Sequence, residues 1–167
     1  MVSAVDRAWA LLEQVPDPEI PVLSIRELGI LREVNQREGA IEVVITPTYS
    51  GCPAMGQIED DVRAAMAAHG MQVNVVTRLA PAWTTDWITE AAKAKLRDYG
   101  IAPPHTTQQT QNIVHLRAQR GKASVEVSCP HCGSTDTTET SHFGSTACKA
   151  LYKCLACLEP FDYFKPY

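Results

Sequence analysis

Apolar residues near the N-terminus recur at helical spacing and predict a first helix over residues 4–15. Ser3 precedes this segment and is a suitable cap for its first turn. Pro16 ends it, and the prolines that follow at 18 and 21 favour a stiff, extended connection. The residues that carry the helical pattern are Val5, Ala8, Trp9, Leu11 and Leu12.

Three segments rich in β-branched and other apolar residues predict strands over 28–34, 41–46 and 73–79. Gly39 lies between the first two, in a position suited to a tight turn. We therefore expect the first two strands to form a hairpin. The third strand is separated from them by a longer, helix-like segment.

In that intervening segment, residues 54–69, apolar residues recur at helical spacing, which predicts a helix with one apolar and one charged face. Pro53 suits the first turn of such a helix and Gly70 its C-terminal cap. A last helix is predicted over 90–99, with Thr89 as its N-cap. Element by element, the pattern predicts helix, strand, strand, helix, strand and helix.

The predicted fold class is α+β. Helices pack on a short mixed sheet in a small α/β layer domain, residues 1–104, and a four-cysteine, zinc-ribbon-like module follows at 123–167. Residues 105–122 are rich in Thr, Gln and Asn and are predicted to be a linker. The C-terminal module is too short to fold on a core of its own, so a metal, disulfides or a partner must stabilise it.

Two Cys-x-x-Cys pairs supply the metal ligands that such a module needs. Twenty-one residues separate the pairs, just beyond the usual spacing of zinc sites built from two such pairs. Four thiolates around one ion form a closed, structural zinc site, and an iron–sulfur cluster uses the same ligand set. The predicted ligands are Cys129, Cys132, Cys154 and Cys157.

Cys148 is a further thiol between the two pairs. From its position it is a spare reactive group, a substitute ligand or an ordinary packed residue. His131 and His142 are possible competing ligands, but a complete set of four cysteines makes them unnecessary.

Cys52 is the candidate functional thiol of the first domain. It lies between Gly51 and Pro53 at the expected start of the second helix, where a helix dipole favours the thiolate. Such a thiolate is a nucleophile, a redox group or a transient metal ligand. The position of Cys52 is equally consistent with a buried, inert cysteine packed under the helix.

Asp17 and Glu19 flank a proline, and two carboxylates on a stiff backbone suit cation binding or proton transfer. They equally suit capping of the following turn. Thr48, on the loop before Cys52, offers a hydroxyl to a ligand or to the turn itself. Trp83 and Trp87, four residues apart, form either a clamp on the core or a patch for a partner.

The net charge of −4 and the pI of about 5.7, with scattered basic residues, argue against a nucleic-acid partner. No apolar stretch reaches the length of a membrane span, and the N-terminus lacks the pattern of a signal peptide. We therefore expect a cytoplasmic location with no membrane partner. In that compartment paired cysteines bind metals or act in redox chemistry more often than they form structural disulfides.

Several stretches of the chain resemble a known family. The segments Asp17–Ile30, Thr48–Pro53 and Pro81–Trp87 look like the small α/β domain of iron–sulfur cluster assembly proteins, including the SufT-like proteins of bacteria. Together with Gly144–Tyr152 and Glu159–Lys165, they resemble the D-subunit family of phenylacetyl-CoA epoxidase systems. The resemblance covers nearly all of the chain except the linker.

The resemblance implies an accessory or maturation factor in aerobic phenylacetate catabolism, more a non-catalytic subunit of a monooxygenase system than an enzyme. Its implied partners are the oxygenase and reductase subunits of the epoxidase, and its implied functional cluster is Cys52, Asp17, Glu19 and Thr48. Two alternatives remain. One is a redox component with a cluster on the C-terminal cysteines, and the other is a zinc-stabilised structural adaptor.

Overall fold

The computed structural model describes residues 3–105 and 126–167 and divides into two compact units. The first unit runs to Trp83 and takes in Trp87–Ala92, and the second comprises Thr84–Asp86 and Lys93–Tyr167. The predicted domain boundaries stay a prediction, because most of the predicted linker, 105–122, lies outside the described residues. Within the described ranges, no helix has the length and apolar character needed to cross a bilayer.

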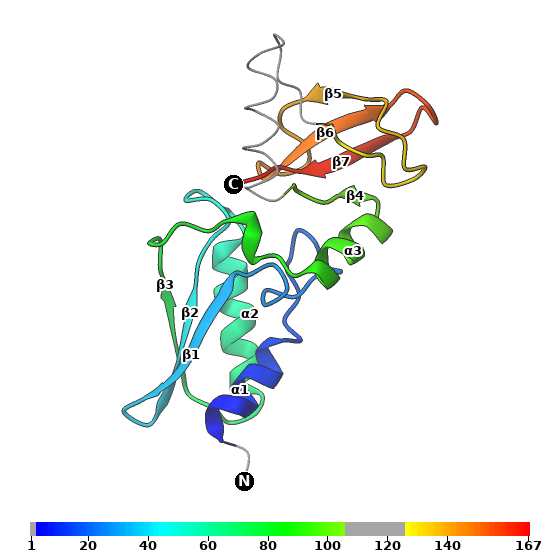
Figure 1. Cartoon of the computed structure of the whole chain (residues 1–167). Helices are drawn as coiled ribbons and strands as arrows, with labels where there is room; N and C mark the ends of the chain where they lie inside the picture. Colours follow the sequence, from blue (N-terminus) through cyan, green and yellow to red (C-terminus); the bar gives the residue numbers. More distant parts are fainter. Residues whose placement is uncertain (1–2, 106–125) are drawn as a thin grey trace. The chain divides into compact units, whose positions relative to one another are not determined.

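A three-stranded sheet forms the centre of the first unit (Figure 1). Strands β1 (Leu31–Arg37) and β2 (Ala40–Ile45) pair antiparallel, which confirms the predicted hairpin. Strand β3 (Val73–Thr77) pairs parallel with β2, so β2 is central. Parallel pairing needs a crossover between the two strands, and helix α2 (Met55–Ala67) provides it.

Two helices pack beside this sheet. Helix α1 (Ala4–Leu12) begins at a capping box, in which Ser3 and Asp6 bond each other's backbone N–H groups. It contacts β1, β2 and α2, while α2 also contacts β3. The buried residues of α2 lie at the predicted helical spacing and, with alternate residues of β2, form the core: Ile58, Val62 and Met66, with Ile41, Val43 and Ile45.

The two tryptophans hold the segment that follows β3 on the first unit. Trp83 is buried, and its indole N–H donates a hydrogen bond to the Leu28 carbonyl at 3.0 Å, as a core clamp requires. Trp87 is half-buried, with the Arg32 guanidinium 3.4 Å from its ring centroid. Gly29 has a φ of +73°, and a Cβ there would lie 2.6 Å from the Trp87 Cβ.

The second unit is built on a four-stranded sheet in the order β4-β7-β6-β5. Strands β5 (Thr137–Ser141), β6 (Lys149–Cys154) and β7 (Pro160–Phe164) are antiparallel neighbours. Strand β4 (Ile101–Ala102) pairs parallel with β7 and follows helix α3 (Glu90–Asp98), whose Ala92 N–H bonds the Thr89 hydroxyl, as expected for an N-cap. The short Thr85–Trp87 turn is a 3-10 helix, η1.

The core of the second unit contains aromatic rings and two cysteines. Tyr152 packs edge-to-face on Tyr163, with their ring centroids 5.4 Å apart. The C-terminal aromatic residues Phe161 and Tyr163 therefore belong to a core strand, β7. The buried members of this core are Ala102, Val127, Cys129, Ala150, Tyr152, Cys154, Phe161 and Tyr163.

We predict opposite effects for two glycine-to-alanine changes in the first unit. Gly29→Ala destabilises the protein by about 2 kcal/mol or more, because it combines a left-handed backbone with a clash against Trp87. Gly56→Ala, in α2 with open space around its Cβ position, stabilises by about 0.5 kcal/mol. Urea unfolding followed by tryptophan fluorescence measures both, and equal effects of the two changes would contradict this account.

Candidate functional site

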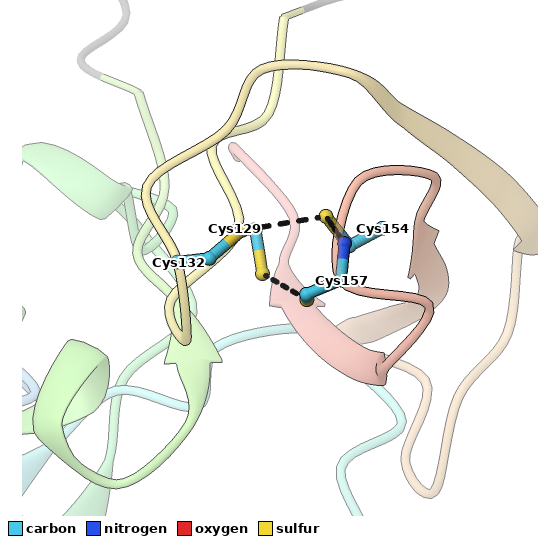
Figure 2. A group of neighbouring side chains, drawn as sticks. All are labelled: Cys129, Cys132, Cys154 and Cys157. Atoms are coloured by element: carbon cyan, nitrogen blue, oxygen red, sulfur yellow. Dashed lines mark hydrogen bonds between the residues drawn. The ribbon is translucent and has the colours of Figure 1, made fainter.

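The four cysteines of the two Cys-x-x-Cys pairs meet at one point (Figure 2). All four Sγ atoms lie within 4.8 Å of one another, and they form the one group of metal-ligating side chains among the described residues. Two of the contacts run between the pairs: Cys132 to Cys154 at 3.6 Å and Cys129 to Cys157 at 3.8 Å. Four sulfurs at about 2.3 Å from a single tetrahedral ion lie about 3.8 Å apart, so the residues fit a bound zinc ion.

The two pairs sit in turns of the same construction. The Cys129 N–H bonds the Ser134 carbonyl at 2.9 Å, and the Cys154 N–H bonds the Glu159 carbonyl at 3.0 Å. In both turns, which we call the first and second knuckles (residues 129–134 and 154–159), the donor and acceptor are five residues apart. Each knuckle thus turns two thiols toward the same point.

Each knuckle also has a left-handed residue directly after its second cysteine. In the first knuckle this residue is Gly133, with a φ of +76°, and in the second it is Leu158, with a φ of +68°. Glycine adopts this conformation without cost, whereas leucine is disfavoured there by about 1–2 kcal/mol. Leu158 is 65% exposed, so burial does not offset that cost. The turn geometry around the ligands therefore prevails over the local preference of the residue.

Burial differs among the four ligands. Cys129 and Cys154 are buried in the core of the second unit, Cys157 is half-buried and Cys132 is exposed. The metal site is thus anchored on its inner side by the core of the sheet, and its outer side faces solvent at Cys132.

The thiols also differ in acidity. The Cys157 N–H donates to the Cys154 sulfur at 3.4 Å and lowers the pKa of Cys154 to about 7. The Glu159 N–H acts to lower the pKa of Cys157, but burial and the neighbouring thiols outweigh it and raise that pKa to about 12. One thiol therefore ionises readily, whereas a metal must displace protons from others. Acid consequently weakens metal binding.

The alternative ligands considered from the sequence lie outside this group. Cys148 is 3% exposed and directly precedes β6, with its sulfur 3.0 Å from the Thr146 hydroxyl, which agrees with an ordinary packed residue. His142 is exposed beside Glu139, and the His131 ring lies 3.3 Å from where a Cβ of Gly100 would be.

In the first unit, Asp17 is 5% exposed, and its Oδ1 accepts hydrogen bonds from the N–H groups of Glu19 and Ile20 at 2.9 and 2.8 Å. Asp17 therefore caps its own turn, as the simpler of the two interpretations expected. Thr48 is buried and Glu19 half-buried. That Asp17, Glu19, Thr48 and Cys52 act as one cluster stays a prediction.

Cys52 is half-buried in a turn that leads into α2. Its N–H bonds the Tyr49 carbonyl at 3.1 Å, and its own carbonyl accepts from the Met55 N–H at 3.4 Å. Helix α2 begins at Met55 after Ala54, which caps it without a side-chain hydrogen bond. Cys52 thus lies just before the helix, whose first residue is one position later than the predicted start at residue 54.

Comparison with known proteins assigns a class to each part of the chain. A family model described as "Iron-sulfur cluster assembly protein" matches residues 6–77, and one described as "PaaD zinc beta ribbon domain" matches residues 115–165. The class is therefore an iron–sulfur assembly-type α/β domain joined to a zinc β-ribbon.

One full-length relative has both parts. It is a protein of Escherichia coli (strain K12), provisionally named as the D subunit of a 1,2-phenylacetyl-CoA epoxidase. It is 51% identical over 164 residues, which cover 96% of this chain and 92% of the relative. The chain belongs to this family of phenylacetyl-CoA epoxidase D subunits.

Shorter relatives match the first part alone. The Fe-S protein maturation auxiliary factor YitW of Bacillus subtilis (strain 168) is 37% identical over 90 residues, which cover 51% of this chain and 85% of YitW. A crystal structure of a DUF59 domain from Bacillus anthracis superimposes with a TM-score of 0.51 at 29% identity, covering 55% of this chain and 90% of that one. The first unit therefore has the fold of this assembly-type domain.

We predict that Cys154→Ser abolishes metal binding and unfolds the second unit. The change removes a buried ligand, and metal binding in such modules supplies folding free energy. Metal content by plasma mass spectrometry should fall from about one ion per chain to a small fraction, with loss of the far-UV signal of the sheet. Cys148→Ser, a buried thiol outside the group, is the matched control and should keep both. Stoichiometric metal with a cooperative fold in Cys154→Ser would contradict a structural metal site.

Proposed function

We propose that this chain is an accessory factor that assists assembly of the iron or iron–sulfur centre of a multicomponent phenylacetyl-CoA epoxidase. The observation that carries the proposal is the pairing, within one chain, of an iron–sulfur assembly-type domain with the zinc ribbon of the epoxidase D-subunit family. Relatives that match only the first domain are named as Fe-S protein maturation factors. In this proposal the first domain assists assembly of the iron or iron–sulfur centre, and the ribbon makes the factor specific for the epoxidase system.

The proposed working group of the first domain is the Cys52 thiol, with Asp17, Glu19 and Thr48. Cys52 is half-buried, which leaves its sulfur within reach of a small ion or a partner's thiol. Asp17 and Thr48 are buried polar residues in a mostly apolar unit. In the proposal this group, with the Cys52 thiol, holds iron or a cluster in transit. The iron here is therefore cargo and not a resident cofactor. The clients are the oxygenase or reductase subunit.

In the same proposal the ribbon holds zinc as a structural ion rather than a cluster. All four sulfurs lie within 4.8 Å of one another, which suits four bonds to one ion. A cluster places several irons and sulfides between the same ligands and needs a wider ring of thiolates. This geometry also argues against the alternative of an electron-transfer component with a cluster on the ribbon. The cytoplasmic location stays a prediction.

The identity of the metal is tested on protein purified without oxygen. We expect about one zinc per chain, no acid-labile sulfide and no visible absorption band, because the zinc ion is colourless and does not change its oxidation state. Iron with matching sulfide and a broad visible band would instead establish the electron-transfer alternative. The measurement uses elemental analysis, a sulfide assay and an absorption spectrum of the same sample.

We expect Cys52→Ser to keep the fold and the zinc but to lose function in cells. The test supplies the variant to a strain that lacks the protein. It then measures the iron and sulfide content of the purified oxygenase and reductase subunits, and phenylacetyl-CoA epoxidation. All three should fall toward the level of the strain without the protein. Ser50→Ala, an exposed residue on the same loop, is the control and should restore them. Full client loading with Cys52→Ser would leave the zinc-stabilised adaptor as the function.

A further inference from the structure

The four metal ligands are not equally accessible to a reagent in solution. Cys132 is the exposed member of the group, whereas Cys129 is 2% exposed and Cys154 is fully buried. Zinc thiolates remain nucleophilic, and oxidation of cysteine follows thiolate character together with exposure. A hydroperoxide in solution therefore meets the Cys132 sulfur before it meets the other three.

The sulfur that lies opposite Cys132 belongs to the other knuckle. Cys132 and Cys154 are 3.6 Å apart across the site, and a disulfide needs its two sulfurs at about 2.05 Å. A displacement of roughly 1.5 Å closes that gap, which is small for an exposed turn residue. The same closure removes two of the four ligands, and a zinc ion held by Cys129 and Cys157 alone loses its closed tetrahedral site.

We propose that the ribbon is a peroxide-responsive metal switch, in which oxidation joins Cys132 to Cys154 across the two knuckles and releases the zinc. The inference rests on the four-cysteine site and on its proposed occupation by zinc, and not on the proposed role in epoxidase maturation.

The chemistry balances in two steps. The Cys132 thiolate attacks the hydroperoxide, an S–O bond forms, the O–O bond breaks, and hydroxide or alkoxide leaves. The Cys154 thiolate then attacks the Cys132 sulfur, the S–S bond forms, the S–O bond breaks, and hydroxide leaves. Two thiolates are oxidised by two electrons, the peroxide is reduced by the same two, and the zinc ion passes to solvent.

The position of the new bond matters for reversal. A Cys132–Cys154 bond keeps the two knuckles together, and Cys154 stays attached to the sheet core through β6. The oxidised ribbon therefore loses its ion without losing the proximity of its ligands. Reduction by a dithiol restores four thiols at one point, ready to bind zinc again.

The test uses the full zinc-loaded chain and hydrogen peroxide in the presence of a colorimetric zinc chelator. We expect one zinc released for each disulfide formed, with Cys132 linked to Cys154 in the peptide map, and recovery of bound zinc after dithiothreitol and added zinc. A disulfide within one knuckle as the first product, or oxidation of Cys52 or Cys148 with the zinc retained, would overturn the proposal.

Two variants sharpen the result. Cys132→His keeps a zinc ligand in a three-cysteine, one-histidine site but removes the exposed thiolate, so peroxide should release its zinc at least several-fold more slowly. Cys148→Ser should release zinc at the native rate, because Cys148 is buried and outside the group. Equal release rates in Cys132→His and the native chain would contradict the assignment of Cys132. If Cys132→His binds no zinc, the peptide map of the native chain decides alone.

Discussion

The second unit depends on the convergence of four thiols within 4.8 Å. Two of those thiols, Cys129 and Cys154, are also members of the hydrophobic core, so the same residues serve metal binding and packing. One strand of its sheet has only two residues, and the buried cluster around Tyr152 has eight members among the described residues, so a unit this short gains from a further cross-link. A metal that ties the two knuckles together compensates for this, since its binding free energy is available only when the ligands have folded into place.

The first unit meets a different constraint and needs no metal to meet it. Two helices packed beside the sheet give it a conventional apolar core, and an aromatic clamp fixes the segment after β3. The close approach of Gly29 to Trp87 shows how tightly that clamp packs, because the position has no room for a side chain. The candidate thiol Cys52 lies in a turn carried by this core, which allows it to serve function while the packing of other residues maintains the fold.

In the proposed function the two units have separate roles, which accounts for the two family signatures of the chain. Relatives that match the assembly-type domain alone are named as Fe-S protein maturation factors. The ribbon adds a metal-held surface whose ligands face solvent at Cys132. In the proposed function the ribbon adapts a general assembly domain to one oxygenase system. As the proposed metal switch, the ribbon also makes the factor responsive to peroxide.

Much of the fold could be predicted from the pattern of the chain. The three strands and the helices of the first unit fall within a few residues of their predicted bounds, because hydrophobic periodicity and capping residues such as Ser3 and Thr89 act locally. The four ligands were identifiable for the same reason, since each pair is contained in one turn. The charge and composition restricted the classes of partner without naming one.

Tertiary structure decided what local pattern cannot encode. Strand β4 is two residues long and carries no period of its own, so only pairing with β7 reveals it. Near the C-terminus, burial of Phe161 and Tyr163 makes β7 a strand of the core. Only the tertiary structure shows that Cys148 is buried outside the metal group, and that Cys132 is the exposed member of that group. The physical reason is the same throughout: exposure and partner distance depend on residues far away in the sequence, whereas periodicity and spacing depend on neighbours.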